Sequence, residues 1–181
     1  MHMNGNSQRN KTATGSYSQK AGGWMTFVAW ASFIAFLGYS FNLYIQKQNN
    51  PNQSVSTAMV DGSKQITLIR NKHGHYVANG EINGQSVVFL LDTGATDVAL
   101  SAKLAKRLRL KKGRPFKVST ANGIANAYRT KLDNVALGEI ERNNVNASIL
   151  SNGPENQVLL GMAFLKHLEL TQKGNQLTIR Q

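Results

Sequence analysis

The chain has 181 residues, enough for one domain with additional segments, and it contains no cysteine. The missing thiol excludes cysteine proteases, disulfide bonds and cysteine-based zinc sites. The 21 Lys and Arg side chains outnumber the nine Asp and Glu side chains, so the net charge is +12. Such an excess can serve nucleic acid, but no zinc finger, basic helical region or aromatic RNA-binding signature accompanies it, and we do not expect nucleic acid as a partner.

Residues 1–23 are polar, with three cations and no acid. A segment of this composition cannot bury enough apolar surface to fold by itself, so we expect a polar tail. Residues 24–45 then hold no charge at all. As a helix they would span roughly 33 Å, about the thickness of a hydrocarbon core.

Aromatic residues lie near both ends of this apolar segment, with Trp24 at the start and Tyr39 and Tyr44 towards the end. Membrane interfaces favour such residues. A buried core helix or a cleaved signal peptide would also be apolar, but signal peptides have shorter apolar regions and no clear cleavage site follows here. We therefore predict a single transmembrane helix over 24–45.

The flanking charges predict the orientation of this helix. Arg9, Lys11 and Lys20 precede it, whereas only Lys47 closely follows it. The positive-inside rule then places the N-terminus in the cytoplasm and the large C-terminal part outside it. In a bacterium with two membranes the protein would be anchored in the inner membrane, with this part in the periplasm.

Residues 46–65 are polar and include Pro51, which predicts a flexible linker. From residue 66 onwards, short β-rich runs alternate with turn residues, and Asn83-Gly84 between two such runs is a strong hairpin signal. The region 66–181 therefore reads as an all-β barrel or sandwich. Two short helices are expected, one over 102–110 with Ser101 as its cap and one over 162–168.

A basic stretch lies within this region. Residues 103–117 carry eight Lys and Arg side chains and no acid. The simplest interpretation is a solvated face. The stretch could also meet an acidic partner or form an electrostatic dock for anionic lipid or nucleic acid.

The chemistry is concentrated in one motif. The apolar run 89–91 leads directly into Asp92-Thr93-Gly94. Peptide hydrolysis by water needs a base and an acid, and two carboxylates about 3 Å apart supply both by sharing one proton. Because the chain has one Asp-Thr-Gly triplet, the second Asp92 would have to come from a second copy related by a two-fold axis.

The two residues after Asp92 have roles in such a design. The hydroxyl of Thr93 can hydrogen-bond across the two-fold axis, and Gly94 permits a tight turn whose N–H approaches the carboxylate. The triplet alone is a weak motif, since Asp also caps many ordinary turns.

With their context, residues 66–181 resemble the retropepsin-like aspartic proteases, and more narrowly their membrane-anchored bacterial branch. Two segments carry the resemblance: Leu90-Leu91-Asp92-Thr93-Gly94-Ala95-Thr96 and Leu159-Leu160-Gly161-Met162-Ala163-Phe164-Leu165. It implies a homodimer of small closed β-barrels with one or two short helices. It also implies a catalytic Asp92, with Thr93, Gly94 and Ala95 supporting its loop, and no metal or cofactor.

The resemblance assigns two further segments. Leu160 and Gly161 would pack against the loop of Asp92 just before the last helix. The hairpin 120–126, with Asn122, Gly123 and Ile124 at its tip, would be the flap that excludes water and donates backbone N–H groups to the substrate. An ordinary surface hairpin is the alternative for this segment.

The histidines are weaker candidates. His73 and His75 could share a metal ion, but no third ligand is evident, so a surface turn is expected; for His167 we expect no catalytic role. Together, these observations predict a membrane-anchored aspartic endopeptidase that cleaves protein or peptide substrates. The main rival is a non-catalytic extracytoplasmic binding or scaffold domain on the same barrel.

Overall fold

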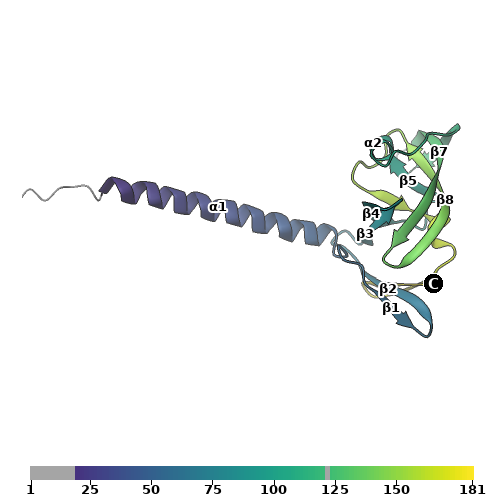
Figure 1. Cartoon of the computed structure of the whole chain (residues 1–181), viewed down its shortest axis with the longest axis horizontal. Helices are drawn as coiled ribbons and strands as arrows, with labels where there is room; N and C mark the ends of the chain where they lie inside the picture. Colours follow the sequence, from purple (N-terminus) through teal and green to yellow (C-terminus); the bar gives the residue numbers. More distant parts are fainter. Residues whose placement is uncertain (1–18, 121–122) are drawn as a thin grey trace, which may run out of the picture. The chain divides into compact units, whose positions relative to one another are not determined.

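The computed structural model describes residues 19–120 and 123–181 and divides the chain into two units (Figure 1). The N-terminal unit ends at Leu43, and the C-terminal unit runs from Tyr44 to Gln181. Among the described residues, every buried hydrophobic side chain belongs to the C-terminal unit, between Ile66 and Ile179. This unit therefore contains a complete hydrophobic core of its own.

Helix α1 (Gln19–Asn49) is the long apolar helix expected from the sequence, and it extends beyond the predicted range 24–45 at both ends. Its segment Gly23–Asn49 is long and apolar enough to cross a membrane, by length and composition, and none of its apolar window is buried. Large apolar side chains such as Trp24, Phe33 and Phe41 are at least half exposed. A helix that is apolar all round, rather than along one stripe, is typical of a membrane span.

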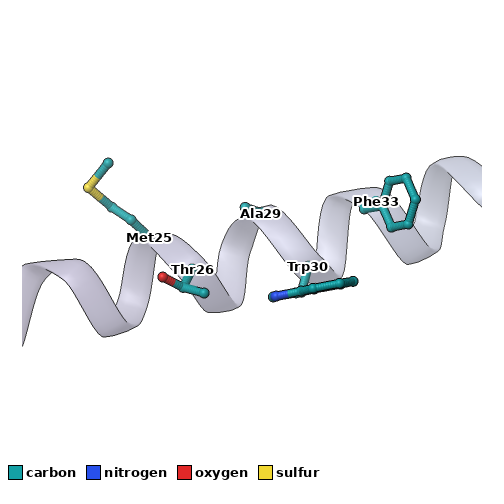
Figure 2. Close-up of a pocket in the computed structure, with 5 residues that line it drawn as sticks. All are labelled: Met25, Thr26, Ala29, Trp30 and Phe33. Atoms are coloured by element: carbon teal, nitrogen blue, oxygen red, sulfur yellow. The ribbon is translucent and has the colours of Figure 1, made fainter.

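The surface of α1 carries one shallow hollow, shown in Figure 2, whose lining consists of Met25, Thr26, Ala29, Trp30 and Phe33. Trp30 and Phe33 meet edge to face there, with ring centroids 6.0 Å apart. All five residues belong to the same helix, so the hollow is a groove between neighbouring side chains and not an enclosed cavity.

The core of the C-terminal unit is a seven-stranded sheet that closes on itself. The strands follow one another in the sheet as β3 (Val77–Ile82), β4 (Gln85–Leu91), β9 (Val158–Leu160), β5 (Val98–Ser101), β8 (Ile140–Leu150), β7 (Gly123–Leu137) and β6 (Pro115–Thr120). An additional pairing of β3 with β7 joins the two sides of the sheet. This closure confirms the predicted all-β closed barrel.

Local sequence explains parts of this barrel. Asn83 and Gly84 both have positive φ angles, 51° and 71°, as the two-residue turn between β3 and β4 requires. At the seam between β3 and β7, a Cβ on Gly80 would lie 2.5 Å from the carbonyl oxygen of Ala136 and equally close to the Phe89 ring. Only glycine lets the two strands and this buried ring come so close.

A second sheet has the order β1-β2-β11-β10. Its strands are β1 (Thr57–Val60), β2 (Ser63–Ile69), β11 (Gln176–Arg180) and β10 (Glu169–Lys173). Alternate residues of its two inner strands are buried in the main core: Ile66 and Leu68 on β2, and Leu177 and Ile179 on β11. This period of two is that of a sheet with one covered face.

The structure differs from the linker predicted over 46–65, because this range contains the end of α1, all of β1 and the start of β2. Asn52 explains much of the difference. Its side chain is buried, donates to the carbonyl oxygens of Ile69 and Val77, and accepts from the N–H of Ile69 at 2.7 Å. The side-chain amide of Asn52 thus makes hydrogen bonds to the backbone that a neighbouring strand would otherwise make. The polar composition of this range therefore does not indicate a flexible linker.

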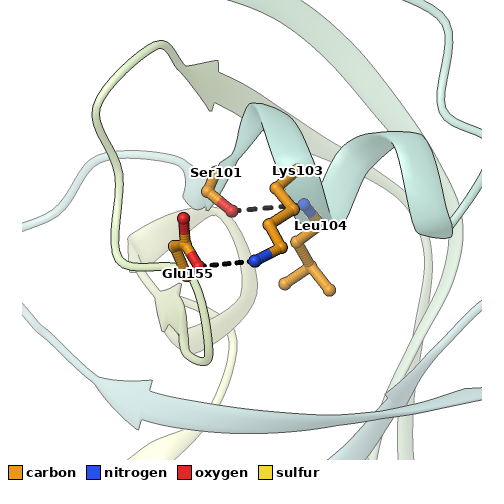
Figure 3. Close-up of polar contacts among 4 residues, drawn as sticks. All are labelled: Ser101, Lys103, Leu104 and Glu155. Atoms are coloured by element: carbon orange, nitrogen blue, oxygen red, sulfur yellow. Dashed lines mark hydrogen bonds and ion pairs between the residues drawn. The ribbon is translucent and has the colours of Figure 1, made fainter.

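Two short helices complete the unit. In α2 (Ala102–Arg107) the hydroxyl of Ser101 accepts from the N–H of Leu104 at 3.2 Å, as drawn in Figure 3. Figure 3 also shows Lys103 paired with Glu155 at 2.7 Å, an exposed ion pair that contributes little to stability. The helix ends earlier than the predicted residue 110, because Arg109 takes a left-handed φ of 56°. Helix α3 (Met162–Leu165) occupies only the first turn of its predicted range.

Candidate active site

Asp92 follows the last residue of β4 directly. Strand β4 runs parallel to β9, with Leu91 opposite Leu160, and the N–H of Asp92 continues this pairing by donating to the carbonyl oxygen of Leu160 at 3.2 Å. Phe89, three residues earlier in β4, is fully buried, whereas Asp92 is partly exposed. A pair of parallel strands with buried positions thus places one carboxylate at the end of β4.

The residues after Asp92 form a tight turn around its side chain. The N–H of Gly94 donates to Oδ1 of Asp92 at 2.9 Å, and the N–H of Ala95 donates to the carbonyl oxygen of Asp92 at 3.2 Å. A Cβ on Gly94 would lie 3.2 Å from that carboxylate oxygen, which is tight. Thr93 is exposed, so its hydroxyl is open to a partner from outside the chain. We call residues 92–97 the Asp92 loop.

The segment after β9 locks the Asp92 loop from the other side. The N–H groups of Met162 and Ala163, in the first turn of α3, donate at 2.8 Å to the carbonyl oxygens of Ala95 and Thr96. Between them and β9 lies Gly161, where a Cβ would stand 2.5 Å from the carbonyl oxygen of Ala95 and 2.3 Å from that of Asp97. The two segments named by the resemblance are therefore in direct contact, and Gly161 cannot carry a side chain.

The end of the Asp92 loop has an anchor that sequence reasoning missed. The hydroxyl of Ser148 donates to Oδ2 of Asp97 at 2.8 Å, and Ser148 is 4% exposed. The parallel pairing of Val98 with Ala147 brings these residues together. The available signal was a single hydroxyl inside the otherwise apolar run 147–150 of β8, but its partner is 51 residues away.

Strands β6 and β7 form the hairpin expected to be the flap. Their register runs from Pro115 opposite Tyr128 to Thr120 opposite Gly123. Gly123 has a φ of 101°, and Ile124 is 76% exposed. The third predicted tip residue, Asn122, lies outside the described residues.

A small apolar cluster connects this hairpin to the strands that carry the Asp92 loop. Phe116 and Val118 of β6 pack with Leu159 of β9 around three buried residues, Ala99, Ala127 and Leu150. Leu159 in turn pairs with Leu90, two residues before Asp92. The base of the hairpin and the strand that leads into the Asp92 loop therefore both contact β9.

The histidines do not join this arrangement. His73 and His75 are exposed, and the N–H groups of both donate to the side chain of Asn71, which makes a local turn. Within residues 19–120 and 123–181, no group of three metal-ligating side chains occurs. His167 lines a cavity of about 300 Å³ together with Thr96 and Asp97. Desolvation, and then the charges of Arg142 and Lys166, lower the pKa of His167.

Known proteins share this architecture. Residues 78–167 match the family model described as "gag-polyprotein putative aspartyl protease". The crystal structure of a retropepsin-like aspartic protease from Rickettsia conorii is similar to this chain, with a TM-score of 0.52 and 27% identity. The similarity covers 70% of this chain and 94% of that one.

Two curated relatives are similar in sequence. An uncharacterised protein from the cobV 5′ region of a Sinorhizobium species is 31% identical over 72% of this chain, and an uncharacterised protein of Rickettsia prowazekii is 32% identical over 58% of it. The chain spans about half the length of these relatives, 58% and 46% respectively. The family match runs from β3 to the segment after α3 and includes the Asp92 loop, the β6–β7 hairpin and Gly161. Through this domain, the chain belongs to the retropepsin-like aspartic protease family.

Proposed function

We propose that this protein is an aspartic endopeptidase whose active site forms when two chains each contribute Asp92. The observation that carries the proposal is the construction of the Asp92 loop. Its carboxylate is fixed by the N–H of Gly94, its backbone by Leu160, and its far end by α3. A loop so rigidly held, with one carboxylate at its edge and one Asp-Thr-Gly per chain, fits a shared dyad.

The chemistry follows from placing two such carboxylates together. One Asp92 is ionised and takes a proton from a water molecule as the water oxygen attacks the peptide carbonyl carbon. The other is protonated and donates its proton to the carbonyl oxygen, which gives a neutral tetrahedral diol. The Asp92 that took the water proton then donates it to the amide nitrogen, while the other Asp92 takes a proton from a hydroxyl of the diol. The C–N bond breaks, the carboxylic acid and amine products leave, and the dyad again holds one proton.

The remaining parts of the proposed site act on position and solvent. The exposed hydroxyl of Thr93 would bond to the partner loop and hold the two carboxylates at a fixed distance. The β6–β7 hairpin would cover an extended peptide, with the exposed side chain of Ile124 against it. Backbone pairing with strand edges would give affinity for a broad set of sequences.

The decisive variant for catalysis is Asp92→Asn in the C-terminal unit. At high protein concentration and from about pH 4 to pH 7, we expect the wild type to cut peptides in a diverse library and the variant to make none of those cuts. Mass spectrometry reads the cleavage sites. The matched control is Asp61→Asn, an exposed carboxylate in the turn of the other sheet, which should leave the cuts unchanged.

Identical cuts by the wild type and Asp92→Asn would remove the catalytic role of Asp92. A demonstrated dimer that makes no cuts would favour the non-catalytic binding domain instead.

The proposal also places the chain in a membrane. Helix α1 would span it once, with the N-terminus in the cytoplasm and the C-terminal unit in the periplasm or another extracytoplasmic space. The support is the apolar segment Gly23–Asn49, with three cations in the residues before it and only Lys47 close to its other end.

Because the chain has no cysteine, single cysteines report this topology cleanly. In cells with a permeable outer membrane, a membrane-impermeant maleimide should label Ser56→Cys and not Ser7→Cys. Labelling of Ser7→Cys alone would reverse the orientation, and labelling of neither would argue against an extracytoplasmic position.

A further inference from the structure

A cleft of about 570 Å³ lies on the C-terminal unit between the segment 109–113 and the middle of β7. Asp133 is the one acid in its lining. Five cations line it: Arg109, Lys111, Lys112, Arg129 and Lys131. Part of the basic stretch 103–117 thus meets two further cations that are distant in the sequence. We call these five residues the basic cleft.

The charges of the basic cleft are not neutralised within the described chain. The ion pairs among the described residues join Lys103 with Glu155 and Arg180 with Asp61. Neither pair includes a residue of the cleft. Asp133 lines the cleft but lies beyond ion-pair distance of all five cations. Uncompensated charge of one sign in a concave surface focuses the electrostatic field and attracts anions.

The walls of the cleft are firmly connected to each other. The N–H of Gly113 donates to the carbonyl oxygen of Arg129 at 2.7 Å, and the N–H of Arg129 donates to that of Arg114 at 3.0 Å. The hydroxyl of Thr130 donates to the carbonyl oxygen of Lys111 at 2.9 Å. A Cβ on Gly113 would stand 2.7 Å from the carbonyl oxygen of Arg129, so the segment 109–113 lies against β7 as closely as a neighbouring strand.

Aromatic rings hold two of the cations. Lys112 Nζ lies 4.8 Å from the centre of the Tyr128 ring, and the guanidinium carbon of Arg129 lies 4.8 Å from the centre of the Phe116 ring. Such contacts limit the freedom of long side chains and leave their charge available. The cleft is therefore a positioned set of cations and not a run of independent lysines.

We propose that the basic cleft binds the phosphate groups of anionic phospholipids, at the surface of the membrane that α1 is proposed to cross. This rests on the proposed function only for the presence of that membrane. The last residues of helix α1, from Tyr44 to Asn49, belong to the C-terminal unit. A membrane crossed by α1 would therefore be at high effective concentration for every copy of the domain. Such contact would hold the active site close to the bilayer and favour substrates that emerge from it.

The test measures binding without the membrane helix, by sedimentation of the C-terminal unit with vesicles. We expect binding to phosphatidylcholine vesicles that contain phosphatidylglycerol, and none to phosphatidylcholine alone. In Lys111→Gln/Lys112→Gln/Lys131→Gln the partition coefficient should fall about 100-fold, since each cation near an anionic surface contributes about fivefold.

The matched control, Lys72→Gln/Lys106→Gln/Lys173→Gln, removes the same charge from exposed sites outside the cleft. We expect it to lose less than about fivefold in partition. Thermal unfolding by circular dichroism verifies that both variants are folded.

Three outcomes would overturn the proposal. They are no binding to anionic vesicles, an equal loss in the two triple variants, or displacement of the protein from vesicles by a short DNA duplex at a phosphate concentration below that of the anionic lipid. The last would assign the cleft to nucleic acid. Asp92→Asn should bind vesicles as the wild type does, and the assay involves no turnover. A failure here therefore leaves the peptidase test intact, and a failure of that test leaves this one intact.

Discussion

Single residues hold the Asp92 loop by contacts that tolerate little change. Gly161 faces two carbonyl oxygens of the loop, and Ser148 bonds to the carboxylate of Asp97 at its end. The resemblance to a known family named Gly161, whereas Ser148 was missed. The reason is physical: Gly161 lies in a recognisable local motif, but the partner of Ser148 is determined by the parallel pairing of β5 with β8, which leaves no local pattern.

Gly161→Ala should destabilise the domain by about 2–3 kcal/mol, because the new Cβ would overlap backbone atoms that cannot move without shifting the Asp92 loop. Peptidase activity should fall with it. Urea unfolding measures the first effect. Gly62→Ala is the control, since its Cβ would meet open space and only its φ of 78° is unfavourable, at about 1 kcal/mol. Equal losses in the two variants would contradict the close contact.

Ser148→Ala should cost about 1–2 kcal/mol of unfolding free energy, because a partly exposed carboxylate loses its hydroxyl donor. A double-mutant cycle with Asp97→Asn isolates the interaction. Once Asp97 is changed, Ser148→Ala should cost much less. Strictly additive losses would mean that the hydrogen bond contributes nothing measurable.

At the scale of elements, turns were predictable and polar anchors were not. The pair Asn83-Gly84 predicts the β3–β4 hairpin, because both turn positions need positive φ angles and these two residue types adopt them readily. By contrast, the polar range 46–65 was expected to be a linker, although Asn52 makes it part of the fold. Composition alone cannot distinguish a side-chain amide that faces water from one that makes the hydrogen bonds of a neighbouring strand.

Asn52→Ala should therefore destabilise the C-terminal unit by about 2–4 kcal/mol, since it leaves the N–H of Ile69 and the carbonyl oxygens of Ile69 and Val77 without their partner. Chemical denaturation provides the measurement. Gln53→Ala, at the exposed neighbouring position, is the control and should change stability by less than about 0.5 kcal/mol. A loss below that value for Asn52→Ala would show that this segment is a linker after all.

The β6–β7 hairpin has its own test, because Ile124 is exposed and its replacement should not affect folding. Ile124→Ser should leave unfolding free energy within about 0.5 kcal/mol and lower kcat/KM roughly tenfold through lost apolar contact with the substrate. Met59→Ser, an exposed apolar residue of β1, should change neither quantity. Unchanged kcat/KM in Ile124→Ser would make the segment an ordinary surface hairpin.

At the scale of the whole molecule, an all-β domain and one long apolar helix followed from the sequence. Barrel closure through β3 and β7, and the parallel pairs β4–β9 and β5–β8, depend on contacts between distant segments. The strand pattern left a barrel and a sandwich open, and the family resemblance favoured the closed barrel. The proposed active site lies at the same scale, since a single chain would contain half of it.

A dimer held mainly by the membrane should be sensitive to dilution once α1 is removed. Below its dissociation constant, the isolated C-terminal unit should lose specific activity about in proportion to concentration, whereas the full chain in proteoliposomes should retain it. Initial rates over a wide dilution series give the answer. Constant specific activity of the isolated unit would contradict control by assembly.

The central claim, that two chains share one pair of carboxylates, is tested most directly by mixing wild type with Asp92→Asn. At fixed total concentration and after subunit exchange, the peptidase rate should follow the square of the wild-type fraction, because only wild-type pairs have both carboxylates. An equal mixture should then retain roughly one quarter of the wild-type rate. Retention of about one half would mean that each chain works alone, and the account of a shared Asp92 dyad would be wrong.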